Sequence, residues 1–179
     1  MIMKKSILFL YLGSTLTALS ANDVYQTPNT GTVYTFADLA KIADSGVIQL
    51  DDNTFSLSKD IDVLDQDGLV LDNNATLRMG ADILVRMYGG NNNFAPADTA
   101  TIMPTEEGIK PKGIHFLDTS VPQTVKHVRF EGAGLRLGAP AGVTVESCSF
   151  IEHNTHIGNY AIGFVASSIN NAVRNCYFY

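Results

Sequence analysis

A six-residue pattern recurs three times in the second half of this chain and constrains its fold more than any other feature. The pattern is an apolar residue, a charged residue, a polar residue, Val or Cys, any residue and then Phe. It occurs as VKHVRF at residues 125–130, VESCSF at residues 145–150 and VRNCYF at residues 173–178. The copies are 20 and 28 residues apart, and the longer step indicates a longer loop. The same residue types in the same slots indicate one repeated structural unit.

The period of this repeat indicates stacked β-strands. Self-similarity at about twenty residues is typical of solenoids, in which each turn buries its face against its neighbours. A slot on one turn then lies about 4.8 Å from the same slot on the next turn. A leucine-rich repeat needs a leucine pattern that is missing, and a β-sandwich would not repeat residue types slot by slot. The sequence therefore predicts a stack of parallel strands, formed as a solenoid.

Short apolar runs broken by Asn, Asp and Gly extend this prediction over residues 47–179. IQLDDN at residues 48–53 is matched 21 residues later by LVLDNN at residues 69–74, which suggests an earlier copy of the repeat. Residues 89–100 are rich in Gly and Asn. We expect them to form an exposed loop that interrupts the stack.

One helix is predicted before the first turn of the solenoid, over residues 35–46. Thr35 can cap its first N–H groups, and Asp38, three residues later, suggests a capping box. Gly46 offers the left-handed conformation that often ends a helix. The apolar residues follow i, i+3, i+4, i+7 spacing and define one face: Phe36, Leu39, Ala40 and Ala43.

With the helix and the repeated coils described, the sequence resembles the right-handed parallel β-helix proteins of the pectin-lyase-like superfamily. The resemblance rests on the helix before the first coil and on the Asn-Cys-x-Phe coil at residues 175–178, and it covers residues 33–179. It implies an all-β fold, a right-handed parallel β-helix whose N-terminal helix caps the open end. Members include polysaccharide lyases, polygalacturonase-like hydrolases and non-catalytic surface proteins, so the fold leaves the function open.

The first twenty residues differ in character from the rest of the chain. Two lysines precede a short apolar run at residues 7–12, and mostly small residues follow up to position 20. This order is typical of a secretory signal peptide, and the run is too short to span a bilayer. We therefore predict a signal peptide over residues 1–20 and a polar N-terminal tail over residues 21–34. The mature protein is expected to be secreted, periplasmic or at the cell surface, without a membrane span.

Composition and charge narrow the classes of function. With 45% hydrophobic and 17% charged residues, the chain has enough apolar material for a core. Its net charge of −6 argues against a nucleic-acid partner, which would require a basic face. The acidic excess lies in residues 21–98, which contain 12 Asp residues and four basic residues. Residues 99–179 contain six charges of each sign. An acidic ligand should therefore prefer the second half.

Alignment of the three copies places charged residues in one column, formed by Lys126, Glu146 and Arg174. We interpret this column as a solvent-facing ladder of ion pairs, each contributing about 1 kcal/mol or less. The alternative is that Glu146 is a carboxylate held between two cations for acid–base chemistry or sugar binding.

Two further columns of the repeat have structural interpretations. Cys148 and Cys176 share a slot, and inward-facing free thiols are favoured over a disulfide, because side chains at matching slots run side by side. The polar slot before them is predicted to form turns with local hydrogen bonds. Its residues are His127, Ser147 and Asn175.

The densest polar cluster lies within residues 152–160, inside the longest coil. A loop that departs from a repeat commonly carries the binding function of a solenoid. Its side chains could supply an acid–base pair, a set of metal ligands, or hydrogen bonds and a stacking ring for a sugar. The catalytic candidates are Glu152, His153 and His156, and the substrate-binding candidates are Asn154 and Tyr160. The alternative is a solvated surface loop.

Three residues of the preceding coil are further substrate-binding candidates. They are Arg129, Glu131 and Arg136. An acidic sugar would find its cationic partners among them, because guanidinium groups bind carboxylates through paired hydrogen bonds.

The sequence predicts no metal site and no cofactor. DIDVLDQDG at residues 60–68 leaves calcium as an alternative, but Val63 breaks the register of an EF-hand loop. Asp60 and Asp62 are expected at outward positions of a strand. A zinc site is not expected, because neither the cysteines nor the histidines of residues 152–160 have the spacing of zinc ligands.

The leading hypothesis, implied by the resemblance, is an exported protein that binds polysaccharide. If it is an enzyme, it would be a polysaccharide lyase or a glycoside hydrolase, with lyase-type cleavage of an acidic glycan favoured. His153 or His156 would remove the proton next to a uronate carboxylate, and Arg129 or Arg136 would neutralise that carboxylate. The alternative is a non-catalytic surface or adhesin-type solenoid.

The end of the chain carries a last expectation. Residues 176–179 are apolar and aromatic, so the final coil would expose a strand edge and a layer of core. We therefore expect the solenoid to be incomplete at its C-terminus, with further coils of the same chain after Tyr179.

Overall fold

The structure is a computed structural model that describes residues 23–89, 91–151, 161–165 and 169–179. Within these residues the chain is almost entirely β, which confirms the all-β prediction. The one helix among them, α1 (Phe36–Ala40), has five residues, and no helix there is long and apolar enough to cross a membrane. The predicted signal peptide lies outside the described residues.

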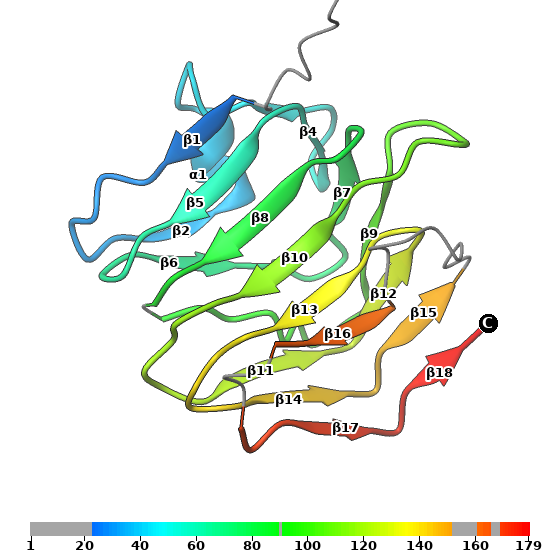
Figure 1. The fold of residues 1–179 in the computed structure, drawn as a ribbon. Helices are drawn as coiled ribbons and strands as arrows, with labels where there is room; N and C mark the ends of the chain where they lie inside the picture. Colours follow the sequence, from blue (N-terminus) through cyan, green and yellow to red (C-terminus); the bar gives the residue numbers. More distant parts are fainter. Residues whose placement is uncertain (1–22, 90, 152–160, 166–168) are drawn as a thin grey trace, which may run out of the picture.

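The described strands form four hydrogen-bonded sheets (Figure 1). The strands of each sheet are named below in their spatial order. The six-stranded sheet contains β1 (Val24–Gln26), β5 (Asp60–Val63), β8 (Leu84–Met87), β10 (Gly113–Phe116), β13 (Leu135–Leu137) and β16 (Ile162–Phe164). The seven-stranded sheet contains β18 (Tyr177–Phe178), β15 (Ser149–Ile151), β12 (Val128–Glu131), β9 (Ala100–Pro104), β7 (Thr76–Met79), β4 (Thr54–Leu57) and β3 (Val47–Gln49). The three-stranded sheet contains β11 (Gln123–Lys126), β14 (Val143–Glu146) and β17 (Ala172–Arg174), and the two-stranded sheet contains β2 (Val33–Thr35) and β6 (Gly68–Val70).

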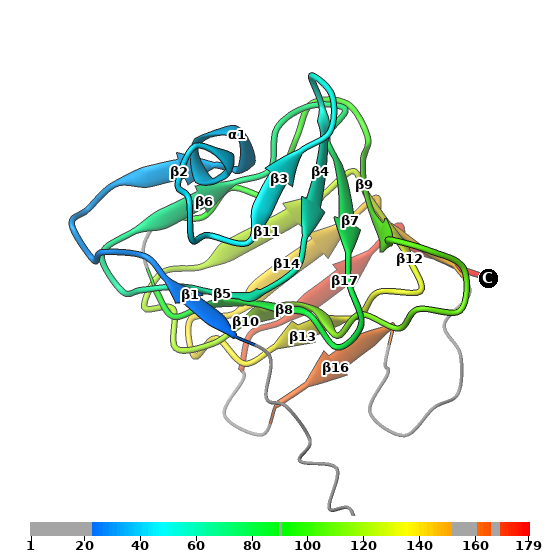
Figure 2. The same ribbon diagram turned by 90° about the horizontal axis from the view of Figure 1, so that it is seen from above.

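The chain visits these sheets in turn, and each strand pairs in parallel with its counterpart from the previous visit. From β10 onward, for example, the order is six-stranded, three-stranded and seven-stranded sheet, repeated three times up to β18. The β3–β4 pair is the one antiparallel pair among the described strands. Two isolated parallel bridges, Val70–Asn93 and Phe94–Val125, continue the two-stranded sheet into the three-stranded sheet. Viewed from above, the sheets surround one interior (Figure 2).

The predicted polar column forms the corners between the three-stranded and seven-stranded sheets. His127, Ser147 and Asn175 each lie between two strands and adopt φ values of 55°, 52° and 50°. Polar residues with short side chains tolerate this left-handed conformation better than branched apolar residues. Each six-residue pattern is therefore two short strands joined by a corner, of one residue in the first copy and two residues in the other two, and the turns predicted at this column are confirmed.

Identical side chains stack inside the fold. The rings of Phe130 and Phe150 are 4.9 Å apart and nearly parallel, and Phe178 follows Phe150 at 5.1 Å. Parallel strands in register force this arrangement, because equivalent side chains stand side by side about 4.8 Å apart. The recurring Phe of the sequence pattern is thus a continuous aromatic column in the core.

The N-terminal region differs from its prediction in two respects. The helix is shorter than residues 35–46: Thr35 and Asp38 form the predicted capping box, but the helix ends at Ala40. Buried Ser45 contributes to this early end, since its hydroxyl donates to the Leu39 carbonyl oxygen and accepts from the Val47 N–H. The predicted polar tail is also part of the sheets, because it contains β1 and most of β2.

Two predicted features of the repeat are wrong. Residues 48–53 are not equivalent to residues 69–74, since β3 forms an antiparallel hairpin with β4, and β4 is the strand that pairs in parallel with β7. Residues 89–100 do not interrupt the stack throughout, because Phe94 is fully buried and forms a bridge with Val125, while Asn93 forms a bridge with Val70. Both errors arose because short apolar alternation looks alike in a hairpin, a strand and a loop that carries one buried ring.

Candidate functional site

Five of the predicted site residues, Glu152, His153, Asn154, His156 and Tyr160, lie outside the described residues. The remaining three predicted binding residues are placed, but the structure does not bring them together. Arg129 and Glu131 lie on β12 in the seven-stranded sheet, where they form an ion pair with each other. Arg136 lies on β13 in the six-stranded sheet. Arg129 is therefore already neutralised, and Arg136 belongs to a different face.

Arg136 belongs to a line of polar side chains that crosses the six-stranded sheet. The register of the strands places one such residue on each of five consecutive strands. We call these residues the outer polar column: Gln26, Asp62, Arg86, His115 and Arg136. Because side chains alternate along a strand, the column points away from the core that its neighbours fill. On β10, for instance, His115 lies between the fully buried Ile114 and Phe116.

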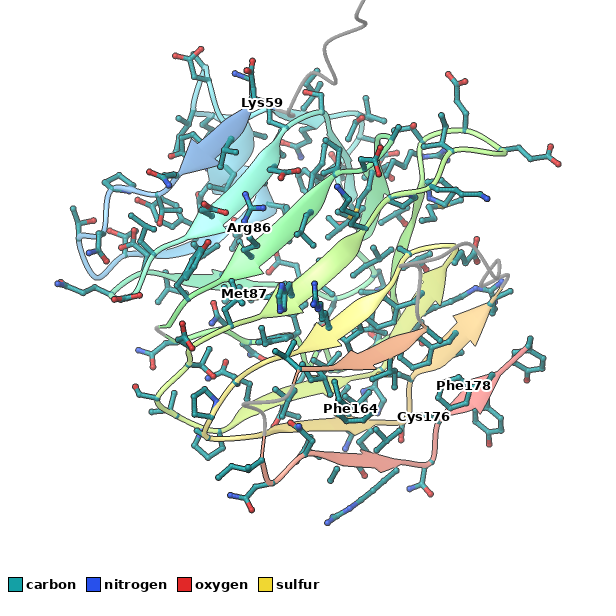
Figure 3. The ribbon with its side chains drawn as sticks, viewed as in Figure 1. Lys59, Arg86, Met87, Phe164, Cys176 and Phe178 are labelled. Carbon is teal, nitrogen blue, oxygen red and sulfur yellow. The ribbon has the colours of Figure 1, made fainter. Side chains whose placement is uncertain are left out.

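The first half of the column is a compact ionic cluster around Arg86, which Figure 3 labels on β8. Its Nε donates to Asp62 Oδ1 at 2.5 Å, and its Nη1 lies 3.2 Å from Asp60 Oδ2. Gln26 Nε2 donates to the other oxygen of Asp62 at 3.4 Å, and Asp60 also accepts from the Leu84 N–H. Burial alone would lower the pKa of Arg86, but the hydrogen bond and charge of Asp62, with the charge of Asp60, raise this pKa overall. Arg86 is therefore held as a cation by two carboxylates.

The second half of the column contains a neutral imidazole beside an exposed cation. His115 is only 7% exposed, and its Nε2 is buried with no hydrogen-bond partner among the described residues. Burial, followed by the charges of Arg136 and Arg86, lowers the pKa of His115 to about 4, against a smaller raising effect of Asp118. Arg136 is exposed, and none of the described carboxylates forms an ion pair with it.

Glycines border this part of the column. Gly163 is the register partner of Arg136 on β16, so no side chain covers the guanidinium from that strand. A Cβ atom on Gly138 would lie 3.3 Å from Nε2 of His115 and 3.1 Å from the Phe116 carbonyl oxygen. The absence of a side chain at Gly138 thus lets the backbone pack against the imidazole.

These two halves differ in the charge that they offer to a ligand. In the first half Arg86 is paired with two carboxylates, Asp60 and Asp62, so it is not available to bind an anionic ligand. In the second half His115 is neutral near pH 7, and the guanidinium of Arg136, which forms no ion pair with a described carboxylate, can donate two parallel hydrogen bonds to a carboxylate. The arrangement therefore supplies one anion-binding position at the end of a line of hydrogen-bonding groups.

The other polar features are occupied by internal contacts. Lys126 Nζ lies 3.8 Å from Glu146 Oε2, and Arg174 follows in register, so the predicted charge ladder is confirmed in its alignment. Cys148 and Cys176 are both free thiols, as expected. Burial raises the pKa of Cys148 to about 12, so this thiol is inert near neutral pH.

Three of the four carboxylates of residues 60–68 considered as calcium ligands, Asp60, Asp62 and Asp67, have internal partners. Asp60 and Asp62 occupy outward strand positions, as predicted, and both face Arg86. Burial would raise the pKa of Asp67, but hydrogen bonds from Thr27 and the backbone of residues 29–32 lower it overall. Within the described part of the chain, no three His, Cys, Asp or Glu side chains gather as a metal-binding group.

Sequence reasoning missed most of the outer polar column, although a signal for it exists. Each strand of the column reads apolar, polar or Gly, apolar, as in Val85-Arg86-Met87 and Ile114-His115-Phe116. The register partners from Ile61 to Ile162 are separated by 24, 29, 21 and 27 residues, however, so no constant period reveals them. Only the strand pairing shows that His115 stands between Arg86 and Arg136.

In comparisons with known proteins, no family model, no curated protein and no solved structure matches this chain.

Proposed function

We propose that this protein is an exported right-handed parallel β-helix that binds an acidic polysaccharide along the outer polar column of its six-stranded sheet. The observation that carries the proposal is Arg136 at the end of that column, which is exposed, forms no ion pair with a described carboxylate and lies beside the neutral His115. The column offers a carboxylate one exposed position, at Arg136, with the buried His115 and the half-buried Arg86 on the two preceding strands of the sheet.

The strand pairing supports the β-helix part of the proposal. The chain passes repeatedly through the same succession of sheets, and successive passes pair in parallel and in register. Right-handed connection is the strong preference for parallel strands joined by a crossover. The sequence resemblance to pectin-lyase-like proteins points the same way.

The spacing and the charge of the column support a polymeric, acidic ligand. Neighbouring strands are about 4.8 Å apart, so an extended ligand that starts at the exposed Arg136 would pass over the buried His115 to the half-buried Arg86. Most of the negative charge lies in the first half of the sequence, and it would repel a polyanion from the strands that precede Arg86. A uronate is therefore expected to place its carboxylate at Arg136 and its neutral hydroxyls along the rest of the column.

The geometry supports binding more strongly than cleavage. A general base must come within about 2.6–3.2 Å of the proton that it removes. Nε2 of His115 is buried, so it does not offer such a contact from the solvent side. The two bases predicted from the sequence, His153 and His156, lie outside the described residues. A non-catalytic surface protein would have the same binding face, so binding is the function common to both hypotheses.

Binding can be tested by replacing Arg136 with Glu and titrating the protein with oligomers of a uronic acid by calorimetry. We expect about tenfold weaker binding for Arg136→Glu, because the variant loses a charge-assisted hydrogen bond and gains a repulsive charge. Lys41→Glu is the matched control. This substitution makes the same change of charge, but at the end of α1, and it should leave binding unchanged. Ultraviolet absorbance of unsaturated products would detect lyase cleavage in the same samples. Equal affinity of the Arg136→Glu variant and the unmodified protein would contradict the proposal.

A further inference from the structure

A second line of side chains runs beside the outer polar column on the same face of the six-stranded sheet. The parallel pairing continues one residue beyond β8 and β10, since the N–H groups of Tyr88 and Leu117 donate to the carbonyl oxygens of Val63 and Met87. The register then aligns Tyr88 with Leu64, after β5, and with Leu117, after β10. We call Leu64, Tyr88 and Leu117 the outer apolar column.

The outer apolar column lies on the outside of the sheet. Side chains alternate along a strand, so Tyr88 points the same way as Arg86 and away from the fully buried Met87 between them. Figure 3 labels Arg86 and Met87 on β8. All three members of the outer apolar column are half-buried, and none belongs to the core that the described residues form. Burial lowers the pKa of Arg86, and the groups that raise it are Asp62, Asp60 and then Tyr88, so the phenol lies near this guanidinium.

The two columns together place an aromatic and apolar line beside a polar one. A pyranose ring has the matching chemistry, because its C–H groups form an apolar face while its hydroxyl and carboxyl groups lie at its edge. The negative face of an aromatic ring attracts such C–H groups, and the hydroxyl of a tyrosine supplies a hydrogen bond. An acidic peptide of Asp residues has no such flat apolar face, so the outer apolar column would add nothing to its binding.

The position of Tyr88 relative to Arg136 suits neighbouring units of one polymer. Two strand spacings of about 4.8 Å and two residues of about 3.3 Å separate them, which gives about 12 Å between their Cα atoms. A ligand that starts at Arg136 and extends over His115 toward Arg86 therefore brings its next unit close to the Tyr88 ring.

We propose that Tyr88 makes the site selective for sugars: the unit next to the uronate at Arg136 stacks on the Tyr88 ring, so the protein prefers an acidic polysaccharide to a polyanion without sugar rings. This inference rests on the proposed function and names the residue that restricts it to glycans. Leu64 and Leu117 extend the apolar surface onto the two neighbouring strands.

Calorimetry with two probes of equal net charge tests the proposal: a galacturonic acid tetramer and tetra-aspartate. The unmodified protein should bind the sugar tetramer about fivefold more tightly than tetra-aspartate. Tyr88→Ala should bind the sugar tetramer about fivefold more weakly and tetra-aspartate unchanged, while Tyr88→Phe, which keeps the ring, should stay within about twofold of the unmodified protein for both probes. Tyr177→Ala is the matched control, because Tyr177 is 63% exposed on β18 of the seven-stranded sheet, and it should change neither affinity.

The outcomes separate this inference from the proposed function. If the sugar tetramer does not bind the unmodified protein, the proposed function fails and the role of Tyr88 fails with it. If the sugar tetramer binds, but Tyr88→Ala binds it equally well or tetra-aspartate binds as tightly, only the role of Tyr88 is overturned. Circular dichroism checks that each variant is folded. Tyr88→Leu, which keeps an apolar side chain on the sheet, should show the same fivefold loss if Tyr88→Ala does not fold.

Discussion

Replacing Gly113 with alanine is expected to destabilise the fold by about 4 kcal/mol. Gly113 has φ +91°, a left-handed conformation that alanine rarely adopts, and an added Cβ would lie 1.9 Å from the Gly134 carbonyl oxygen. That carbonyl cannot move away freely, because it accepts the hydrogen bond from the Ile114 N–H. The clash would force β10 away from β13 and separate His115 from Arg136. Denaturant unfolding of the variant and the unmodified protein measures the loss.

Gly108 provides the matched control for this prediction. It also has a left-handed backbone, with φ +81°, but no atom lies within 4 Å of an added Cβ. Gly108→Ala should therefore show the conformational cost alone, about 1 kcal/mol. A loss of similar size at the two positions would mean that the close approach of Gly134 does not hold the register of β10.

Phe150→Ala is expected to have the second large effect, a loss of about 3–5 kcal/mol in the free energy of unfolding. Phe150 is fully buried and stacks between Phe130 at 4.9 Å and Phe178 at 5.1 Å. Its removal would leave a cavity that the neighbouring coils cannot fill, because their backbones are fixed by parallel pairing. Urea denaturation followed by circular dichroism gives the change.

The same column contains its own control, because Phe178 has the same side chain and is 56% exposed. Phe178→Ala removes one stacking contact without creating a closed cavity, and its expected cost is about 0.5 kcal/mol. Equal losses of stability in Phe150→Ala and Phe178→Ala would mean that Phe150 is packed no more tightly than the exposed Phe178. The description of the core as stacked layers would then be wrong.

The repeated part of the fold could be predicted from the sequence because its slots are specific. The corners at His127, Ser147 and Asn175, the alignment of the charged column and the stacked Phe residues all follow from one six-residue pattern. A residue type that recurs at a fixed slot carries information that a single amphipathic strand lacks.

The N-terminal half was less predictable because its spacing varies and local patterns are ambiguous there. The hairpin β3–β4 and the true parallel strand β4 both alternate apolar and polar residues, so only pairing separates them. The helix was predicted too long because its apolar spacing continues past Ala40. In the structure the hydroxyl of Ser45 donates a hydrogen bond to the Leu39 carbonyl oxygen, and the chain leaves the helix there.

Of the residues of the candidate site, only Arg136 was predicted from the sequence, and there is a physical reason why the others were not. Its neighbours in the column, Arg86 and His115, come from strands that are far apart in the sequence and separated by loops of different lengths. The burial and the lowered pKa of His115 depend on charges that only the folded sheet brings close. Sequence patterns cannot encode that juxtaposition when the loops between strands vary.

The most direct test of the binding site is the imidazole signal of His115, followed by nuclear magnetic resonance between pH 3.5 and 7.5 with and without a uronic acid oligomer. The His115→Gln variant assigns the signal among the four histidines. We predict a pKa of about 4 in the free protein, raised in the bound protein because the ligand carboxylate offsets the charge of Arg136. A free imidazole that titrates near its ordinary value of 6.5, or a pKa unchanged at saturating oligomer, would contradict the account.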